Sequence, residues 1–119
     1  MARTRPQVVI DETANFTVGY TGTAYPIGTI TTGTVTPDPA NGNLQKVTNG
    51  GAFTLAAPTA SDDYTILIAL KTVTGGGTIT VTGFTKVTGD TITNANGDKF
   101  MLAISNVDGI LWLNVASMQ

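Results

Sequence analysis

The stretch Tyr64-Thr65-Ile66-Leu67-Ile68-Ala69-Leu70 is almost continuously apolar, and it is the part of the sequence that decides the fold. Three of its residues are β-branched, which favours an extended strand over a helix. Ser61-Asp62-Asp63 precedes it and Gly75-Gly76-Gly77 follows shortly after, so turn signals limit it to the length of a strand. Such a run is typical of a central strand that is covered on both faces.

Shorter alternating segments lie on both sides of this run. Those predicted as strands are Leu44–Thr48, Ala52–Ala56, Thr78–Val81, Phe84–Val87, Lys99–Ser105 and Ile110–Val115. Asn49-Gly50-Gly51 and Asp108-Gly109 supply the positive φ values that tight turns need, so each is predicted to close a hairpin. Gly83 indicates a bend between its two neighbouring strands.

The composition supports the same fold class over the whole chain. Roughly one residue in five is threonine, a residue that suits a pleated and half-buried surface. We therefore predict an all-β protein, an antiparallel β-sandwich or barrel of about seven to nine short strands. The predicted core consists of Phe53, Leu55, Ile66, Ile68, Leu70, Ile79, Val81, Phe100, Leu102, Ile104, Leu111 and Leu113.

The first third of the chain differs from the rest. Gln7–Ile10 and Phe16–Tyr20 read as short strands, whereas residues 21–39 are polar, rich in Gly and Thr, and contain three prolines. We predict an extended N-terminal arm over residues 1–40 and a β domain over residues 41–119; ordinary edge strands of the same domain are the alternative. Short sequences such as Lys-Val-Thr recur at unequal spacings, so no repeat architecture is predicted.

The missing residue types restrict the chemistry. Without histidine or cysteine there is no Ser-His-Asp triad, thiolate metal site or disulfide framework. Asp62 and Asp63 are adjacent and fit a turn better than an acid–base pair. Asn94-x-Asn96-Gly97-Asp98 lacks the acidic first residue and the distal glutamate of a calcium loop, and it too reads as a turn. We expect no enzyme, no cofactor and no metal site.

The charge pattern restricts the partners. Six basic residues against eight acidic ones give no stripe for nucleic acid. No signal peptide and no stretch long enough to span a membrane is recognised, so we expect synthesis in a cytoplasm. Arg3 and Arg5 are candidates for contact with a protein partner. Trp112 is a third candidate, because it lies on the opposite side of its strand from Leu111 and Leu113.

A resemblance covers about residues 36–119. It is carried by the segments 49–58 (Asn-Gly-Gly-Ala-Phe-Thr-Leu-Ala-Ala-Pro), 83–90 (Gly-Phe-Thr-Lys-Val-Thr-Gly-Asp), 96–100 (Asn-Gly-Asp-Lys-Phe) and 112–115 (Trp-Leu-Asn-Val). Taken together, they resemble small β-rich virion proteins of tailed bacteriophages and modules at the ends of tail or fibre proteins. The resemblance implies a module that assembles on the particle, often as a trimer, without an active site.

The expected function follows from this resemblance and from the composition. The first expectation is a capsid decoration (cement) protein that contacts the major capsid protein or other virion proteins, as a homotrimer, after assembly in the bacterial host cytoplasm. The alternative is a tail or fibre component in which Tyr20, Tyr25 and Trp112 contact host saccharide. An enzyme that acts on carbohydrate through paired carboxylates is the third reading, and the least favoured.

Overall fold

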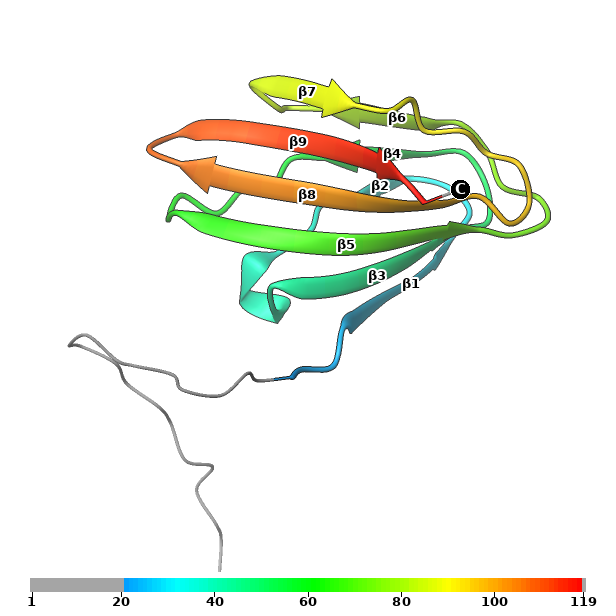
Figure 1. The fold of residues 1–119 in the computed structure, drawn as a ribbon, viewed down its shortest axis with the longest axis horizontal. Coiled ribbons are helices and arrows are strands. Elements are labelled where there is room, and N and C mark those ends of the chain that lie inside the picture. The colour runs from blue at the N-terminus through cyan, green and yellow to red at the C-terminus, as the bar shows by residue number, and fades with distance from the viewer. Residues whose placement is uncertain (1–20, 119) are drawn as a thin grey trace, which may run out of the picture.

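The computed structural model describes residues 21–118, whose regular secondary structure is nearly all β-strand (Figure 1). Sheet A has the strand order β1-β3-β5-β8-β9-β7, and sheet B has the order β2-β4-β6. The strands are β1 (Tyr25–Ile30), β2 (Thr34–Val35), β3 (Leu44–Asn49), β4 (Phe53–Ala56), β5 (Tyr64–Thr72), β6 (Ile79–Thr82), β7 (Lys86–Gly89), β8 (Lys99–Val107) and β9 (Ile110–Ser117). A single 3-10 turn, Pro39–Asn41, lies between β2 and β3.

From β1 to β6 the chain alternates between the two sheets, and successive strands within each sheet are parallel. Each pair of strands therefore makes one coil, and three coils stack into a short solenoid-like body, with sheet A across the front of Figure 1 and sheet B behind it. The prediction of an all-β chain is confirmed. The prediction of an antiparallel sandwich or barrel was wrong, because only the ladders β5–β8 and β8–β9 are antiparallel.

The turn at Asn49-Gly50-Gly51 shows why the hairpin prediction failed there. β3 and β4 lie in different sheets, so this turn is a corner between sheets. The Gly50 N–H donates to the Ile30 carbonyl of the preceding coil (2.9 Å), and the Asn49 carbonyl accepts from Val73 N–H of the following coil (3.2 Å). Its backbone groups thus pair between coils, which satisfies them as completely as a hairpin would.

The stacked positions show a repeat that the sequence did not reveal. Thr34, Thr54 and Thr80 lie side by side across sheet B. In sheet A, Thr29 lies beside Thr48, and Thr48 lies beside Lys71. The intervals between partners are unequal because the corners differ in length, so a search at fixed period misses the repeat. The prediction of no repeat architecture was therefore wrong for β1 to β6.

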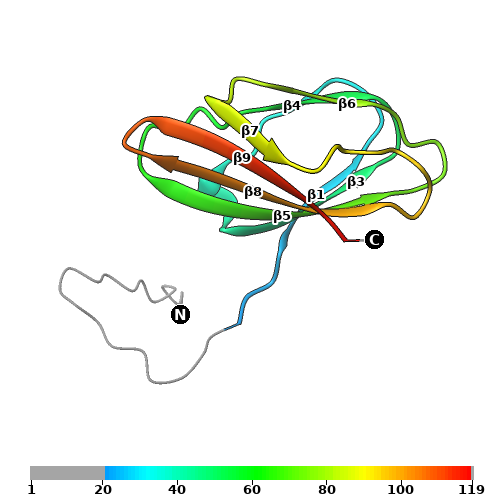
Figure 2. The ribbon, with the colours of Figure 1, turned by 45° about the horizontal axis from the view of Figure 1, so that its top comes forward.

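The hairpin of β8 and β9 is confirmed. Asp108 and Gly109 have φ values of 53° and 78°, the left-handed pair that a two-residue hairpin turn requires. The hairpin lies in sheet A between β5 and β7. If the sheet contained only stacked coils, β5 and β7 would be neighbours. It widens sheet A beyond sheet B, as the two ribbon views show (Figures 1 and 2).

The core lies between the two sheets. Most of the predicted core is confirmed, since nine of the predicted side chains are buried and Ile79, Val81 and Leu111 pack partly buried against them. Val35, Val47 and Val115 complete the buried core and were not predicted.

Two short strands lie within the segment predicted as an arm: β1 is an edge of sheet A and β2 is an edge of sheet B. The predicted strands Gln7–Ile10 and Phe16–Tyr20 lie outside the described residues.

Candidate interaction surface

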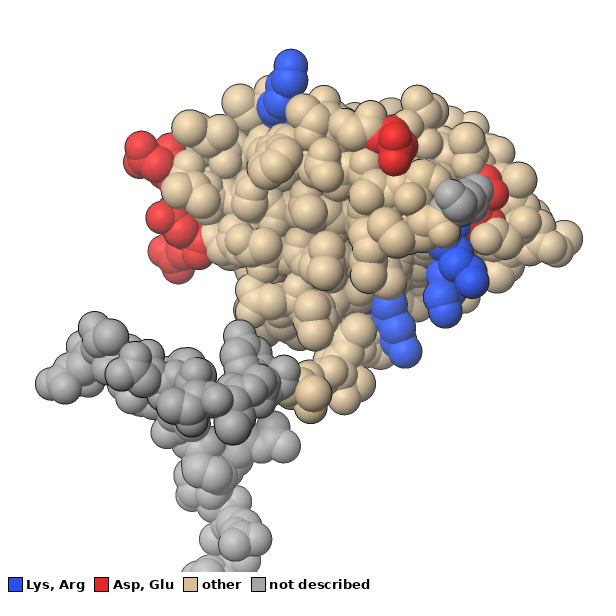
Figure 3. All heavy atoms as spheres, viewed as in Figure 1, with Lys and Arg blue, Asp and Glu red and all other residues tan. Residues whose placement is uncertain are grey.

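The outward side chains of sheet A form one broad surface, named here the outer face. They alternate along each strand with the buried residues of the core. The paired positions form rows across the sheet, in which Leu44 lies beside Leu67, Leu67 beside Ala103, and Ala103 beside Asn114. The next row contains Lys46, Ala69, Met101 and Ala116. Figure 3 shows the middle of this face without a charged side chain.

The exposure of Leu67 corrects the interpretation of the central apolar run. That run does form β5 in the middle of sheet A, but only one of its faces is covered. Leu67 is 36% exposed and its neighbour Leu44 is 44% exposed. Sequence reasoning missed this pair because it did not predict the parallel register of β3 and β5, although the unbroken apolar run was a signal that a second face needs cover.

Trp112 lies on the outer face, as predicted from its place opposite Leu113. Its ring is 42% exposed, whereas Leu113 is fully buried. The indole N–H donates to Thr88 Oγ1 (2.7 Å), and the Thr88 hydroxyl in turn donates to Asn114 Oδ1 (2.8 Å). The polar edge of the indole is therefore satisfied within the chain, and the apolar surface of the ring is left for a partner.

A shallow depression lies beside Trp112 at the end of the outer face that contains the hairpin turn. Val107 and Ile110 line it and are 59% and 62% exposed, among the most exposed large apolar side chains of residues 21–118. Lys86 and Asp108 provide polar groups on its lining. An exposed apolar cluster with polar neighbours is typical of a protein contact site.

Figure 3 shows a group of acidic side chains at the left of the view and basic side chains at the lower right, with another basic side chain at the top and acidic ones at the upper right. Asp62, Asp63 and Asp108 form the acidic end, where β5 begins and the β8–β9 hairpin turns. Lys46, Lys71 and Lys99 form the basic end. Lys71 and Lys99 are directly paired across β5 and β8, and like charges in that position are destabilising. Arg3 and Arg5, the other predicted contact residues, lie outside the described residues.

Asp63 and Asp98, two of the carboxylates considered as candidates for chemistry, and also Asp38 accept hydrogen bonds from backbone N–H groups. Asp63 Oδ1 accepts the backbone N–H of Asp108 (3.0 Å) and ties the start of β5 to the hairpin turn. Asp98 Oδ2 accepts the N–H of Ala95 (3.0 Å) within its own turn. Asp38 Oδ1 accepts the N–H of Ala40 (2.9 Å) and caps the 3-10 turn. Among residues 21–118, no group of three or more acidic side chains is placed to hold a metal ion.

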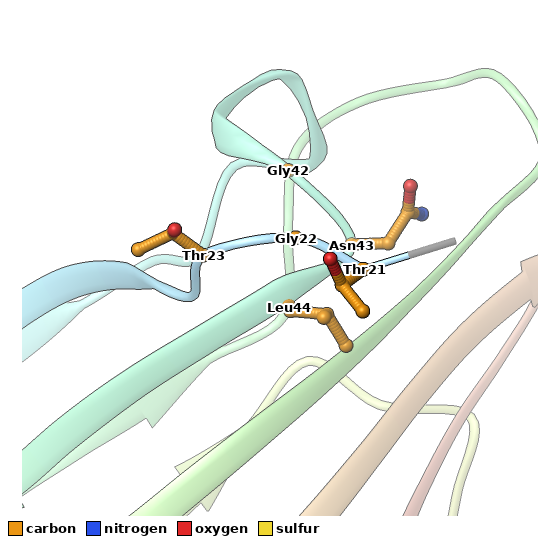
Figure 4. Close-up of a pocket in the computed structure, with 6 residues that line it drawn as sticks. All are labelled: Thr21, Gly22, Thr23, Gly42, Asn43 and Leu44. Atoms are coloured by element: carbon orange, nitrogen blue, oxygen red, sulfur yellow. The ribbon is translucent and has the colours of Figure 1, made fainter. Parts of the chain in front are cut away.

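Another hollow lies beside the start of β1 (Figure 4). It is lined by Thr21, Gly22, Thr23, Gly42, Asn43 and Leu44. The side chains of Thr23 and Asn43 point away from each other, and Asn43 Nδ2 donates to the Thr65 carbonyl. Its polar groups therefore do not converge on a bound molecule.

Tyr64 lies at the start of β5. Burial raises the pKa of its phenol, because the charged form loses water. Its hydroxyl is buried and has no hydrogen-bond partner. It packs against the core at the start of β5, where it is paired with Asn106 of β8.

Comparisons with protein-family models, with curated proteins and with solved structures give no match to this chain. No helix within residues 21–118 is long and apolar enough to cross a membrane.

Proposed function

We propose that this protein is a structural component of a bacteriophage particle, a capsid decoration (cement) protein that contacts the major capsid protein or other virion proteins. The observation that carries the proposal is the outer face of sheet A, which is broad, uncharged in its middle and apolar at Leu44, Leu67 and Trp112. Such a face suits burial against other protein subunits. The sequence resemblance over residues 36–119 supplies the virion context and the expectation of a homotrimer.

The stacked coils support a role in which the protein must resist unfolding. The buried Asn49 side chain links the corners of successive coils, since Nδ2 donates to the Gly77 carbonyl (2.8 Å) and Oδ1 accepts from the N–H groups of Gly51 (3.2 Å) and Gly77 (3.1 Å). A buried amide that makes three hydrogen bonds to the backbone favours one arrangement of that backbone. Such a body resists unfolding without disulfides, which the cysteine-free chain cannot form.

The experiment that tests this function uses particles of the encoding phage that lack the protein. Purified full-length protein is added to these heads, and bound protein and the temperature of DNA release are measured. The proposal predicts saturable binding and release at a higher temperature. Heads that bind none of the protein, or that bind it without gaining heat resistance, contradict the decoration role.

The tail or fibre alternative rests on exposed aromatic rings. Tyr25 is 41% exposed on β1, and Trp112 is 42% exposed on β9. Three strands of sheet A separate them, so they do not make one saccharide platform within a single copy. Saturable binding of the protein to host cells, with none to heads, would favour the alternative.

A further inference from the structure

We propose that the outer face of sheet A docks against a second copy of this chain, with the acidic end of one copy on the basic end of the other. This inference rests on the part of the proposed function in which the chain assembles with itself. It names the surface and the relative orientation of the copies.

The first argument is the uncovered middle of the sheet. The strand β5 has apolar side chains, Leu67 and Ala69, in the middle of its outward side, yet the single chain covers only its inner side. Leu44, Leu67 and Met101 lie in adjacent rows, with only small neutral side chains such as Ala69 and Ala103 between them. Small neutral residues between larger apolar ones leave a flat surface that another sheet face can approach closely.

The second argument is the charge pattern. Within residues 21–118 no salt bridge neutralises the lysines of the basic end or the aspartates of the acidic end. Two carboxylates, Asp90 and Asp98, also lie near the basic end, where Asp90 Oδ2 accepts the Ser117 N–H (2.8 Å) and Asp98 Oδ2 accepts the Ala95 N–H. Lys71 and Lys99 are directly paired across β5 and β8, so additional carboxylates from a second copy would lower the repulsion between them.

A second copy with its ends exchanged supplies what each end lacks. The aspartates of one copy then face the lysines of the other, and the aliphatic stems of those lysines cover the apolar cluster of Val107, Ile110 and Trp112. A copy placed with like ends together would set three lysines on three lysines. Opposite ends meet in a twofold pair in which the strands of the two outer faces run antiparallel.

The test is a charge exchange on the purified full-length protein, read by analytical ultracentrifugation. Lys71→Glu reverses one of the three charges of the basic end, and Asp62→Lys reverses one of the three charges of the acidic end, so each variant weakens the attraction between opposite ends. Both positions are exposed, so the fold is retained. Each variant alone should associate about tenfold more weakly than the wild type, and an equimolar mixture should recover association. The control Thr34→Glu with Thr80→Glu changes the net charge by the same amount as Lys71→Glu, but on sheet B, and should associate like the wild type.

Three results would overturn the inference. They are a wild type that stays monomeric at the highest soluble concentration, a sheet B control that weakens association as much as Lys71→Glu, and a mixture of the two variants that fails to recover. These results leave the proposed decoration role untouched, since that role is measured on heads. Failure to bind heads, conversely, leaves the self-association result standing.

Discussion

Replacement of Asn49 by alanine tests the coil stacking most sharply. The side chain is fully buried and makes hydrogen bonds to Gly51 and Gly77 at the corners of its own and the next coil. Asn49→Ala removes three hydrogen bonds and leaves their backbone partners without replacements. At about 0.5–1.5 kcal/mol for each bond, the free energy of unfolding should fall by about 2–4 kcal/mol. That is a large share of the roughly 5–15 kcal/mol typical of a small domain.

Equilibrium unfolding in urea, followed by circular dichroism, measures this loss. Asn96→Ala is the matched control, because Asn96 is an exposed asparagine in a turn, and it should change the free energy of unfolding by less than about 0.5 kcal/mol. Asn49→Asp keeps the acceptor oxygens but cannot donate to the Gly77 carbonyl and buries a charge, so it should be no more stable than the alanine variant. An Asn49→Ala protein as stable as the Asn96→Ala control would refute the reasoning about the corner.

Three further predictions concern single residues. Gly77→Ala should lower the free energy of unfolding by about 1–3 kcal/mol or more in the same urea assay, because its Cβ would lie 2.2 Å from the Ala52 backbone nitrogen. Gly22→Ala is the control and should not destabilise the fold, because its Cβ would meet no atom within 4 Å. The raised pKa of Tyr64 predicts a contribution to stability that is complete below the ordinary tyrosine pKa of about 10 and is lost as the pH rises through the folded-state pKa. In thermal melts at alkaline pH, Tyr64→Phe should therefore lose less stability than the wild type. An identical loss of stability in both proteins would count against this role of Tyr64. Trp112→Ala should weaken self-association in the ultracentrifuge while changing the urea midpoint little, because the ring is half exposed; unchanged association would show that the ring lies outside the contact.

Local sequence signals predicted the strands and most of the core because they depend on neighbours along the chain. The alternation in residues 99–115 and the Asp108-Gly109 turn gave the β8–β9 hairpin. The same reasoning failed at Asn49-Gly50-Gly51, where the turn residues are those of a hairpin. The choice between a hairpin and a corner depends on partners in other coils, such as Ile30 and Val73, which no local pattern specifies.

The candidate surface was predicted only in part for the same reason. Trp112 could be placed outward, because its strand alternates regularly around Leu113. The basic end could not be predicted, since Lys71 and Lys99 become neighbours only through the pairing of β5 with β8. The exposed pair of Leu44 and Leu67 likewise depends on the parallel register of two strands that are separated by β4 in the sequence. A surface assembled from several strands needs the strand order, which the composition does not specify.

The most direct test of the central claim is a cryo-electron microscopy reconstruction of the mature particle with this chain located in it. The account predicts density for the β domain on the outer surface of the head, at threefold positions, with the outer face of sheet A turned toward neighbouring copies of the chain. Density found only at the tail tip, or copies on the head whose outer faces point into solvent, would contradict it.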